Sequence, residues 1–166
     1  MKKRRTKPIR RPRTHPRKKA SHPSGNTPSG SFRLEIKSDP REIRKVEPFL
    51  MKVNKTARLD DGTFYRLLVA STEAVNNGIL HGNKSDPGKK VTITCDLAED
   101  ALVIHIADEG GGFKPENVPD PLEEENLLKT SGRGVFLMKS LMDGVKYEVR
   151  PGGTDVELTI NLKLLH

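Results

Sequence analysis

The chain has 166 residues, of which 33% are hydrophobic and 4% aromatic, a size that fits one domain and not comfortably two. Its single cysteine, Cys95, excludes an internal disulfide and a thiolate metal cluster. Its formal charge of +8 is unevenly distributed, because residues 1–30 hold 11 of the 30 Lys and Arg residues and none of the 22 Asp and Glu residues.

Residues 1–30 are dominated by Lys, Arg, Pro, Ser and Gly, with Ile9 as the one large apolar residue. Such a segment cannot bury enough surface to offset the entropy lost on ordering, so we predict a disordered basic arm ahead of one domain at residues 31–166. The arm lacks the apolar region of a secretory signal, and no apolar stretch approaches the roughly 20 residues that span a bilayer. We therefore expect a cytoplasmic protein that is not an integral membrane protein.

The domain begins with a strand, predicted by the alternation of apolar and charged residues over 32–37. A helix is predicted from Pro40, whose ring suits a first helical turn, to about Thr56. A second helix is predicted to begin at Asp60, an acidic residue at the positive end of the helix dipole, and to end near Gly82, which can serve as its C-terminal cap.

Two alternating apolar runs at residues 91–97 and 102–108 predict a hairpin, in which Cys95 is a buried structural thiol. The Gly-, Pro- and acid-rich segment 109–131 is long enough to be a lid or a binding loop. A helix is then predicted at residues 132–142.

Two last alternating runs, at residues 145–149 and 155–162, form a second hairpin through a Pro-Gly-Gly turn. Strands combined with helices gathered on one side predict an α+β fold. We expect a two-layer α/β sandwich whose mixed, mostly antiparallel sheet carries the helices on one face.

The second helix carries the first candidate site. Glu73 and Asn77 are four residues apart, so they project from one face of the helix. The amide oxygen of Asn77 can bind Mg²⁺, a hard cation, and Glu73 can act as a general base. Alone, the pair also fits two polar residues at the rim of a core helix.

The second candidate site follows a strand directly, in the run Asp108-Glu109-Gly110-Gly111-Gly112. An aspartate at a strand end can accept a hydrogen bond from an exocyclic amine such as that of adenine. Glycine lets the backbone approach a ligand and lets the following loop hinge. A plain Gly-rich turn is the alternative, which the long loop after it disfavours.

The third candidate site is the helix start Ser131-Gly132-Arg133-Gly134. Free N–H groups and the helix dipole make such a position an anion site, and Arg133 and nearby Lys129 add positive charge. Glycines also occur at ordinary helix starts, so this segment alone is weak support.

In this order, the three segments resemble the N, G1 and G2 boxes of GHKL ATPases. The stretch 32–162 further resembles the anti-sigma serine kinases that restrain bacterial sigma factors, a family built on a histidine-kinase-like ATPase domain with the Bergerat fold. The best matches are residues 72–77 with 81–82, residues 121–134, and residues 153–154.

The resemblance implies that the chain binds ATP and Mg²⁺. Asn77 would ligate Mg²⁺, Glu73 would take the proton from an attacking serine hydroxyl, and Asp108 would recognise adenine with support from the Thr154 hydroxyl. The resemblance also implies that other positions shape the pocket and its lid or contact phosphates, namely Gly110, Gly112, Gly132, Arg133 and Gly134.

Glu73 helps to decide which member of the GHKL superfamily the chain resembles. Sensor histidine kinases usually place Asn there, because an imidazole nucleophile needs little help to lose a proton, whereas a serine hydroxyl benefits from a nearby carboxylate. Gyrase and mismatch-repair ATPases carry the Glu but attach further domains, for which we expect no room here. We predict an ATP-dependent serine/threonine-protein kinase and anti-sigma factor.

The predicted partners are a STAS-type anti-sigma-factor antagonist, which the kinase would phosphorylate, and a sigma factor, which it would sequester. The resemblance also implies a homodimer. The basic arm can contact nucleic acid or an anionic surface nonspecifically, or it is a solubilising tail. The alternative functions are a nucleotide-dependent binding protein without significant kinase activity and a histidine-kinase-like ATPase partner domain.

Overall fold

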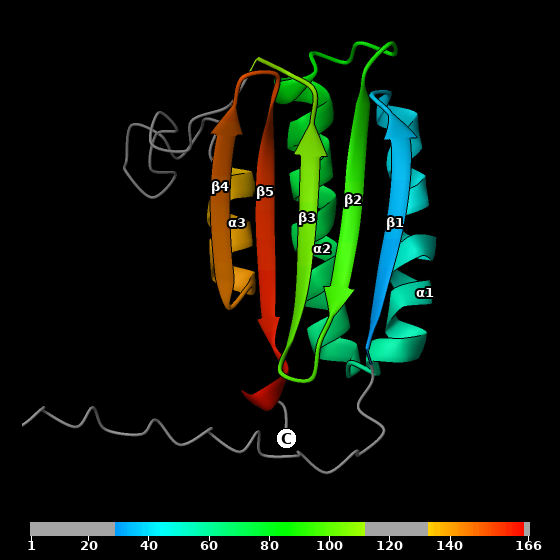
Figure 1. Cartoon of the computed structure of the whole chain (residues 1–166), viewed down its shortest axis with the longest axis vertical. Helices are drawn as coiled ribbons and strands as arrows, with labels where there is room; N and C mark the ends of the chain where they lie inside the picture. The colour runs from blue at the N-terminus through cyan, green and yellow to red at the C-terminus, as the bar shows by residue number, and fades with distance from the viewer. Residues whose placement is uncertain (1–28, 112–132, 165–166) are drawn as a thin grey trace, which may run out of the picture.

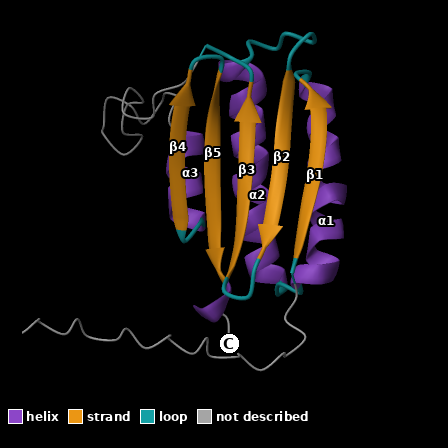
Figure 2. Cartoon of the chain, in the orientation of Figure 1, coloured by secondary structure: helices purple, strands orange, loops and turns teal. Residues whose placement is uncertain are grey.

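The computed structural model describes residues 29–111 and 133–164, which form a five-stranded sheet with helices packed on one face (Figures 1 and 2). This arrangement confirms the predicted α+β sandwich. The strands are β1 (Gly30–Lys37), β2 (Lys90–Leu97), β3 (Ala101–Asp108), β4 (Gly144–Arg150) and β5 (Gly153–Asn161). The helices and short helical turns are η1 (Pro40–Lys45), α1 (Val46–Ala57), α2 (Asp61–Asn77), η2 (Gly78–Gly82), α3 (Arg133–Leu141) and η5 (Leu162–Leu164).

All four strand pairings in the sheet, whose order is β1-β2-β3-β5-β4, are antiparallel. This corrects one detail of the sequence prediction, which was a mixed sheet. β3 and β4 do run in the same direction, but β5 lies between them (Figure 1). Because the chain passes down α1 and back up α2 between β1 and β2, the second strand descends beside the first and is antiparallel to it.

The core lies between the sheet and the helices and consists of alternate strand residues. The register places Cys95 beside Ile104 and Ile104 beside Leu158, and all three side chains are 0% exposed. Removing a large apolar side chain of this kind from water stabilises a fold by roughly 1.5–3 kcal/mol. The predicted burial of Cys95 is confirmed, and burial raises the pKa of its thiol to about 12, which keeps it protonated at neutral pH.

A side-chain cap and an apolar stripe fix the position of α2. The Asp60 carboxylate accepts a hydrogen bond from the Thr63 N–H at 2.9 Å, which satisfies one of the free donors at the helix start. Leu67, Ala70 and Ala74 lie at helical spacing and are at most 1% exposed. Within the described ranges, no helix combines the length and the hydrophobicity that a bilayer-spanning segment needs.

Helical backbone reaches Gly82 as predicted, but its last turn is the wider π-type turn η2. Gly82 is not the predicted C-terminal cap, because the turn ends on Asn83, whose N–H donates to the Gly78 carbonyl at 2.8 Å. Gly82 instead allows close packing. A Cβ at this position would lie 2.5 Å from Cγ and Oδ2 of Asp108.

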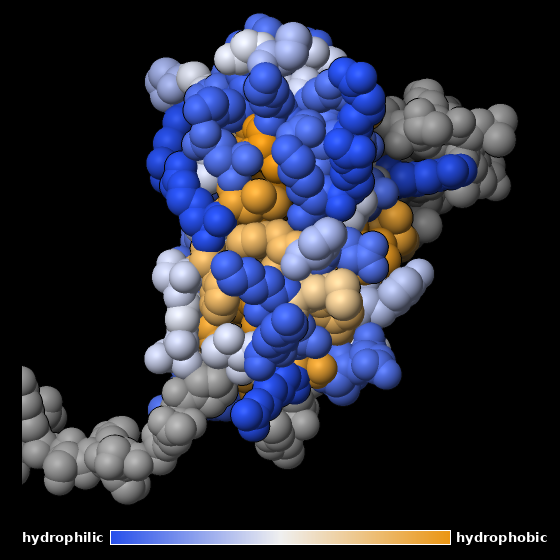
Figure 3. All heavy atoms as spheres, turned by 90° about the vertical axis from the view of Figure 1, so that its right-hand side faces the viewer, coloured by the Kyte–Doolittle hydropathy of each residue, from blue (hydrophilic) through white to orange (hydrophobic). Residues whose placement is uncertain are grey.

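One edge of the sheet carries apolar side chains. Among the described strands, β1 pairs only with β2, so its other side is a sheet edge. Phe32 and Leu34 of β1 and Phe49 of α1 are only partly buried, and Met51 is 53% exposed. Figure 3 looks onto this side of the molecule and shows apolar side chains gathered between hydrophilic ones.

Candidate functional site

Four segments that are distant in sequence meet at one end of the sheet, the upper end in Figure 1. They are the end of α2 with η2, the end of β3, the start of α3, and the turn between β4 and β5. The end of β3 lies beside the start of β5 because Ala107 pairs with Asp155 in the antiparallel register. The three candidate sites of the sequence therefore lie at the same end of the domain.

A pocket lies at this end, between α2 and the inner face of the sheet. Three of its lining residues, Asn77, Asp108 and Thr154, come from three different segments, and the sequence had selected each of them. The rest of the wall is largely apolar and comprises Ala74, Gly78, Ile106, Tyr147 and Val156. A few polar groups in an apolar wall are the usual lining of a small-molecule site. The cavity itself is narrow, about 10 Å³, so the surrounding side chains must move apart to admit a ligand.

Backbone donors hold the Asp108 carboxylate at the strand end. Its Oδ1 accepts hydrogen bonds from the N–H of Gly110 at 2.8 Å and of Thr154 at 3.2 Å. Burial is the largest effect and raises the pKa of Asp108 above its ordinary value, and these two hydrogen bonds and the charge of Lys89 offset only part of that rise. The carboxylate is a fixed hydrogen-bond acceptor in a half-buried position.

Three glycines enclose Asp108 so closely that no side chain fits at any of them. A Cβ at Gly110 would lie 2.0 Å from the Gly82 carbonyl oxygen, and a Cβ at Gly153 would lie 1.9 Å from the Asp108 carbonyl oxygen. A Cβ at Gly82 would collide with the Asp108 carboxylate itself. Atoms in contact normally remain more than 3 Å apart, so these backbone segments can meet only if all three residues are glycine.

Glu73 and Asn77 face the start of α3. A Cβ at Gly134 would lie 2.8 Å from Oε2 of Glu73 and 3.2 Å from Nδ2 of Asn77, so the two side chains converge on this glycine. Arg133 is exposed at the first position of the same helix. A carboxylate, a carboxamide and a helix N-terminus thus adjoin the pocket, which combines a proton acceptor with groups that bind anions.

The donor set suits a cation that takes most of its ligands from elsewhere. No group of three or more His, Cys, Asp or Glu side chains that could hold a metal ion occurs within residues 29–111 and 133–164. Mg²⁺ usually keeps several waters and binds one or two protein oxygens plus substrate phosphates. The amide oxygen of Asn77, beside Gly134 at the start of α3, has the chemistry of one such protein ligand.

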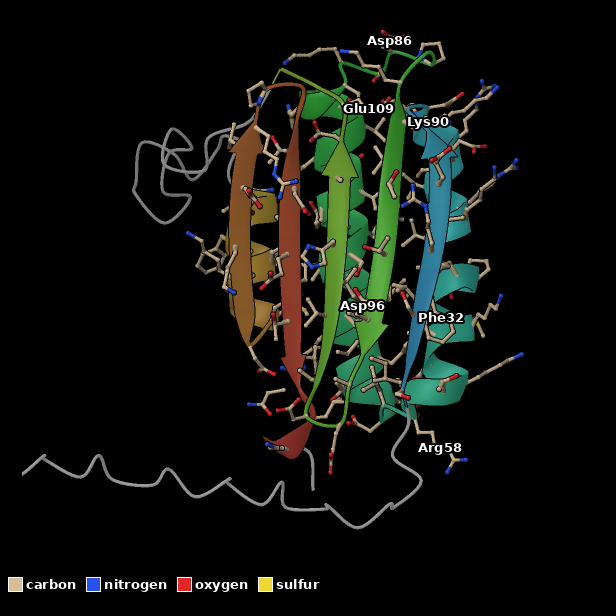
Figure 4. The ribbon with its side chains drawn as sticks, viewed as in Figure 1. Phe32, Arg58, Asp86, Lys90, Asp96 and Glu109 are labelled. Atoms are coloured by element: carbon tan, nitrogen blue, oxygen red, sulfur yellow. The ribbon has the colours of Figure 1, made fainter. Side chains whose placement is uncertain are left out.

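Asn83 fixes the strand end and is a residue that the sequence analysis did not select. It is 0% exposed, its Oδ1 accepts from the Glu109 N–H at 2.9 Å, and its Nδ2 donates to the Lys90 carbonyl at 2.8 Å. The Glu109 carboxylate also accepts from the Lys90 N–H at 2.8 Å. Figure 4 shows Glu109 and Lys90 at the ends of adjacent strands. The hydrogen bonds of Asn83 connect both residues to η2, which Asn83 follows directly.

The structure therefore places seven of the selected residues around one end of the sheet, and four others, Gly112, Lys129, Ser131 and Gly132, lie outside the described residues. The seven are Glu73, Asn77, Asp108, Gly110, Arg133, Gly134 and Thr154. Sequence reasoning missed the contacts of Gly82 and Gly153 and the pocket position of Tyr147. A glycine directly before Thr154 was the only available signal for Gly153, and Asn83 resembled any polar turn residue.

Comparison with known proteins shows that residues 36–160 match the histidine kinase-like ATPase domain family. An anti-sigma F factor from Oceanobacillus iheyensis is 35% identical over 120 residues, which are 70% of this chain and 80% of that protein. The serine-protein kinase RsbW of Bacillus subtilis is 33% identical over 94 residues, and the match covers 53% of this chain and 59% of the kinase. The chain thus spans less than two thirds of this kinase relative.

A solved structure with the same fold is that of the RsbU and RsbW domains of Rv1364c from Mycobacterium tuberculosis. It matches with a TM-score of 0.59 and 17% identity, over 78% of this chain and 32% of that chain. At this identity the likeness shows the fold alone.

The contact between Gly110 and Gly82 predicts a position-specific sensitivity to substitution. Gly110→Ala should lower the free energy of unfolding by about 2 kcal/mol or more, because the new Cβ collides with backbone and moves the strand end. Gly111→Ala is the matched control, since a Cβ there meets nothing within 4 Å, and it should change stability by less than about 0.5 kcal/mol. Urea denaturation of both variants measures the difference, and equal effects would contradict the packing described.

Proposed function

The chain belongs to the histidine kinase-like ATPase domain family, and we propose that it is an ATP-dependent serine/threonine-protein kinase and an anti-sigma factor. The observation that carries the proposal is the convergence of Glu73 and Asn77 on the start of α3, beside the pocket that contains Asp108. The names of the relatives, an anti-sigma F factor and serine-protein kinases, support the same activity.

The pocket binds the adenine of ATP. Asp108 accepts a hydrogen bond from the exocyclic amine, and its orientation is held by the N–H groups of Gly110 and Thr154. The Thr154 hydroxyl supports this contact. Gly110 lets η2 and the strand end close around the base, and Gly112, outside the described residues, adds freedom to the chain that follows.

Phosphates are bound at the start of α3. Gly134 leaves room beside Glu73 and Asn77, and Arg133 contributes positive charge at the same helix end. The family's G2 box adds Gly132, with Lys129 and Ser131 nearby, all outside the described residues. Asn77 holds Mg²⁺, which when bound neutralises the charge of the phosphates.

Glu73 acts as the general base for phosphoryl transfer to a serine or threonine hydroxyl. As the hydroxyl oxygen bonds to the γ-phosphorus, the bond from that phosphorus to the ADP oxygen breaks, and the hydroxyl proton passes to Glu73. A serine hydroxyl is weakly acidic, so a carboxylate in this position assists it. The remainder of catalysis is positioning and charge neutralisation by the pocket.

The proposed protein partners are a STAS-type anti-sigma-factor antagonist, as the substrate, and a sigma factor, as the sequestered ligand. Both act in the cytoplasm, where we place this protein. Support comes from the match to the anti-sigma F factor, which covers 80% of that protein.

We also propose that two copies of the chain associate through the edge formed by β1 and α1. The open side of β1 can pair with another strand, and the partly buried Phe32, Leu34 and Phe49 with exposed Met51 give this edge an apolar surface (Figure 3). A self-complementary edge of this kind suits a symmetric homodimer.

The basic arm, residues 1–30, adds a nonspecific contact with nucleic acid or another anionic surface. Its 11 Lys and Arg residues have no acidic neighbours within the segment, and it lacks aromatic residues that could stack on bases. The contact is therefore electrostatic and sensitive to salt.

The kinase proposal predicts that Glu73→Gln lowers phosphoryl transfer by about 10²–10⁴-fold, because the proton acceptor is lost while the shape is kept. The assay measures phosphate incorporation from labelled ATP into the antagonist. Glu99→Gln, in the exposed β2–β3 turn, is the matched control and should retain full activity. Full activity of Glu73→Gln would refute the base role. An ATP-dependent complex without any phosphoprotein would favour the nucleotide-dependent binding protein instead.

The dimer proposal predicts that Met51→Lys weakens self-association about tenfold or more, because a charge then enters an apolar interface. Sedimentation equilibrium measures the dissociation constant. Val149→Lys, at a 40% exposed position on the opposite edge strand β4, is the control and should leave association unchanged. If Val149→Lys weakened self-association and Met51→Lys did not, the interface would lie at β4 instead.

The arm proposal predicts that removal of residues 1–28 abolishes retention on duplex DNA and on anionic vesicles at low salt. For the intact chain, the logarithm of the DNA affinity should fall with the logarithm of salt concentration by about 0.9 per phosphate contacted. Retention on both surfaces that persists after the deletion would show that the arm has no such role.

A further inference from the structure

Arg66 joins the two helices that carry the proposed phosphate site. It lies on α2, and its Nη1 donates a hydrogen bond at 3.2 Å to the carbonyl of Leu141, the last residue of α3. The last carbonyls of a helix have no partner within the helix and carry a partial negative charge. The guanidinium is a cation, so this is a charge-assisted bond between residues 75 positions apart in the chain.

The contacts at the two ends of α3 lie in register. Arg66, Glu73 and Asn77 are spaced by seven and four residues, which places all three along one face of α2. Glu73 and Asn77 converge on Gly134 at the start of α3, and Arg66 reaches its end. Gly134 and Leu141 are also seven residues apart, and the two helices run in opposite directions (Figure 1). About 10 Å of helix therefore separates the two contacts on both partners.

Apolar packing alone does not set this register. Val135 and Met138 bury the inner side of α3 against the core. Burial of apolar surface is non-directional, so it holds the helix against its neighbours without fixing how far the helix lies along its own axis. A directional hydrogen bond such as that of Arg66 supplies this constraint.

A second anchor at the same end of α3 leads to the sheet. The Asp143 N–H donates to the Thr159 carbonyl at 3.0 Å, and the Asp143 carboxylate accepts from the Asn161 N–H at 2.7 Å. These bonds connect the end of α3 to β5. The bond of Arg66 connects it to α2, the helix that carries both side chains facing the start of α3.

We propose that Arg66 is a positioning residue, which sets the register of α3 on α2 and thereby the distance from the start of α3 to Glu73 and Asn77. This inference rests on the proposed binding of phosphates at that helix start. Arg66 lies two helical turns from Glu73 and acts through α3, without contact to the nucleotide. Its loss therefore affects the phosphates, whereas Asp108, which is held by separate backbone donors, keeps its position at the base.

The affinities of the full chain for MgATP and for adenosine test the assignment, because adenosine has the base but no phosphate. Arg66→Gln should lower the ratio of the MgATP affinity to the adenosine affinity about fivefold or more, since a displaced helix start loses its contacts with the phosphates. Calorimetry measures MgATP, and NMR titration measures adenosine. Loss of folded protein weakens both ligands by the same factor and cancels in the ratio, so a merely structural role would leave the ratio unchanged.

Lys139→Gln is the matched control. Lys139 is an exposed basic residue in the last turn of α3, so its replacement removes a positive charge from the same helix end and leaves the Arg66 bond in place. The affinity ratio of this variant should equal that of the wild type. An equal loss in both variants would assign the effect to the charge at the helix end and overturn the role in register.

NMR spectra without nucleotide give a second readout. The amide signal of Gly134 should shift in Arg66→Gln, while that of Gly110, at the end of β3, should stay in place. An unshifted Gly134 signal, or an affinity ratio equal to that of the wild type, overturns the positioning role while ATP binding stands. If the wild type binds neither MgATP nor adenosine, the proposed function fails and this inference fails with it.

Discussion

The site depends on the contact of three backbone segments around one carboxylate. Asp108 is held by two N–H groups, from Gly110 and Thr154, that belong to different strands or their extensions. Because Gly82, Gly110 and Gly153 carry no side chains, η2 and the β4–β5 turn can close on the end of β3. This contact holds the Asp108 carboxylate in place at the pocket.

The sheet topology brings the other candidate residues to the same end of the domain as that contact. β3 ends beside the start of β5 in an antiparallel register, and α2 and α3 reach the same end of the domain with opposite directions (Figure 1). The helix that supplies Glu73 and Asn77 thus ends where the other begins with Arg133 and Gly134. The side chains proposed to accept from the base, to bind Mg²⁺ and to contact the phosphates therefore lie on or directly beside regular elements, which position groups more rigidly than loops do.

Rigid polar contacts behind the pocket support this arrangement. Asn83 is buried and bonds to Glu109 and Lys90, so the turn after α2 cannot move without breaking hydrogen bonds at the ends of two strands. The π-type geometry of η2 widens the last helical turn and brings Gly82 against Asp108. Single π-type turns in helices often accompany functional sites, and here the turn fixes the acceptor in the pocket.

Periodicity and residue types at local spacing were enough to predict the α+β class, the five strands, the two hairpins and the α2 helix, and to select Glu73, Asn77 and Asp108 as candidate site residues. The pairing of β1 with β2 and of β3 with β5, the packing role of Gly82, and the positions of Asn83 and Tyr147 became visible only in the folded chain. Each of these depends on atoms brought together from segments far apart in the chain. Periodicity shows which face a residue occupies, but not which residue of another segment will lie opposite it.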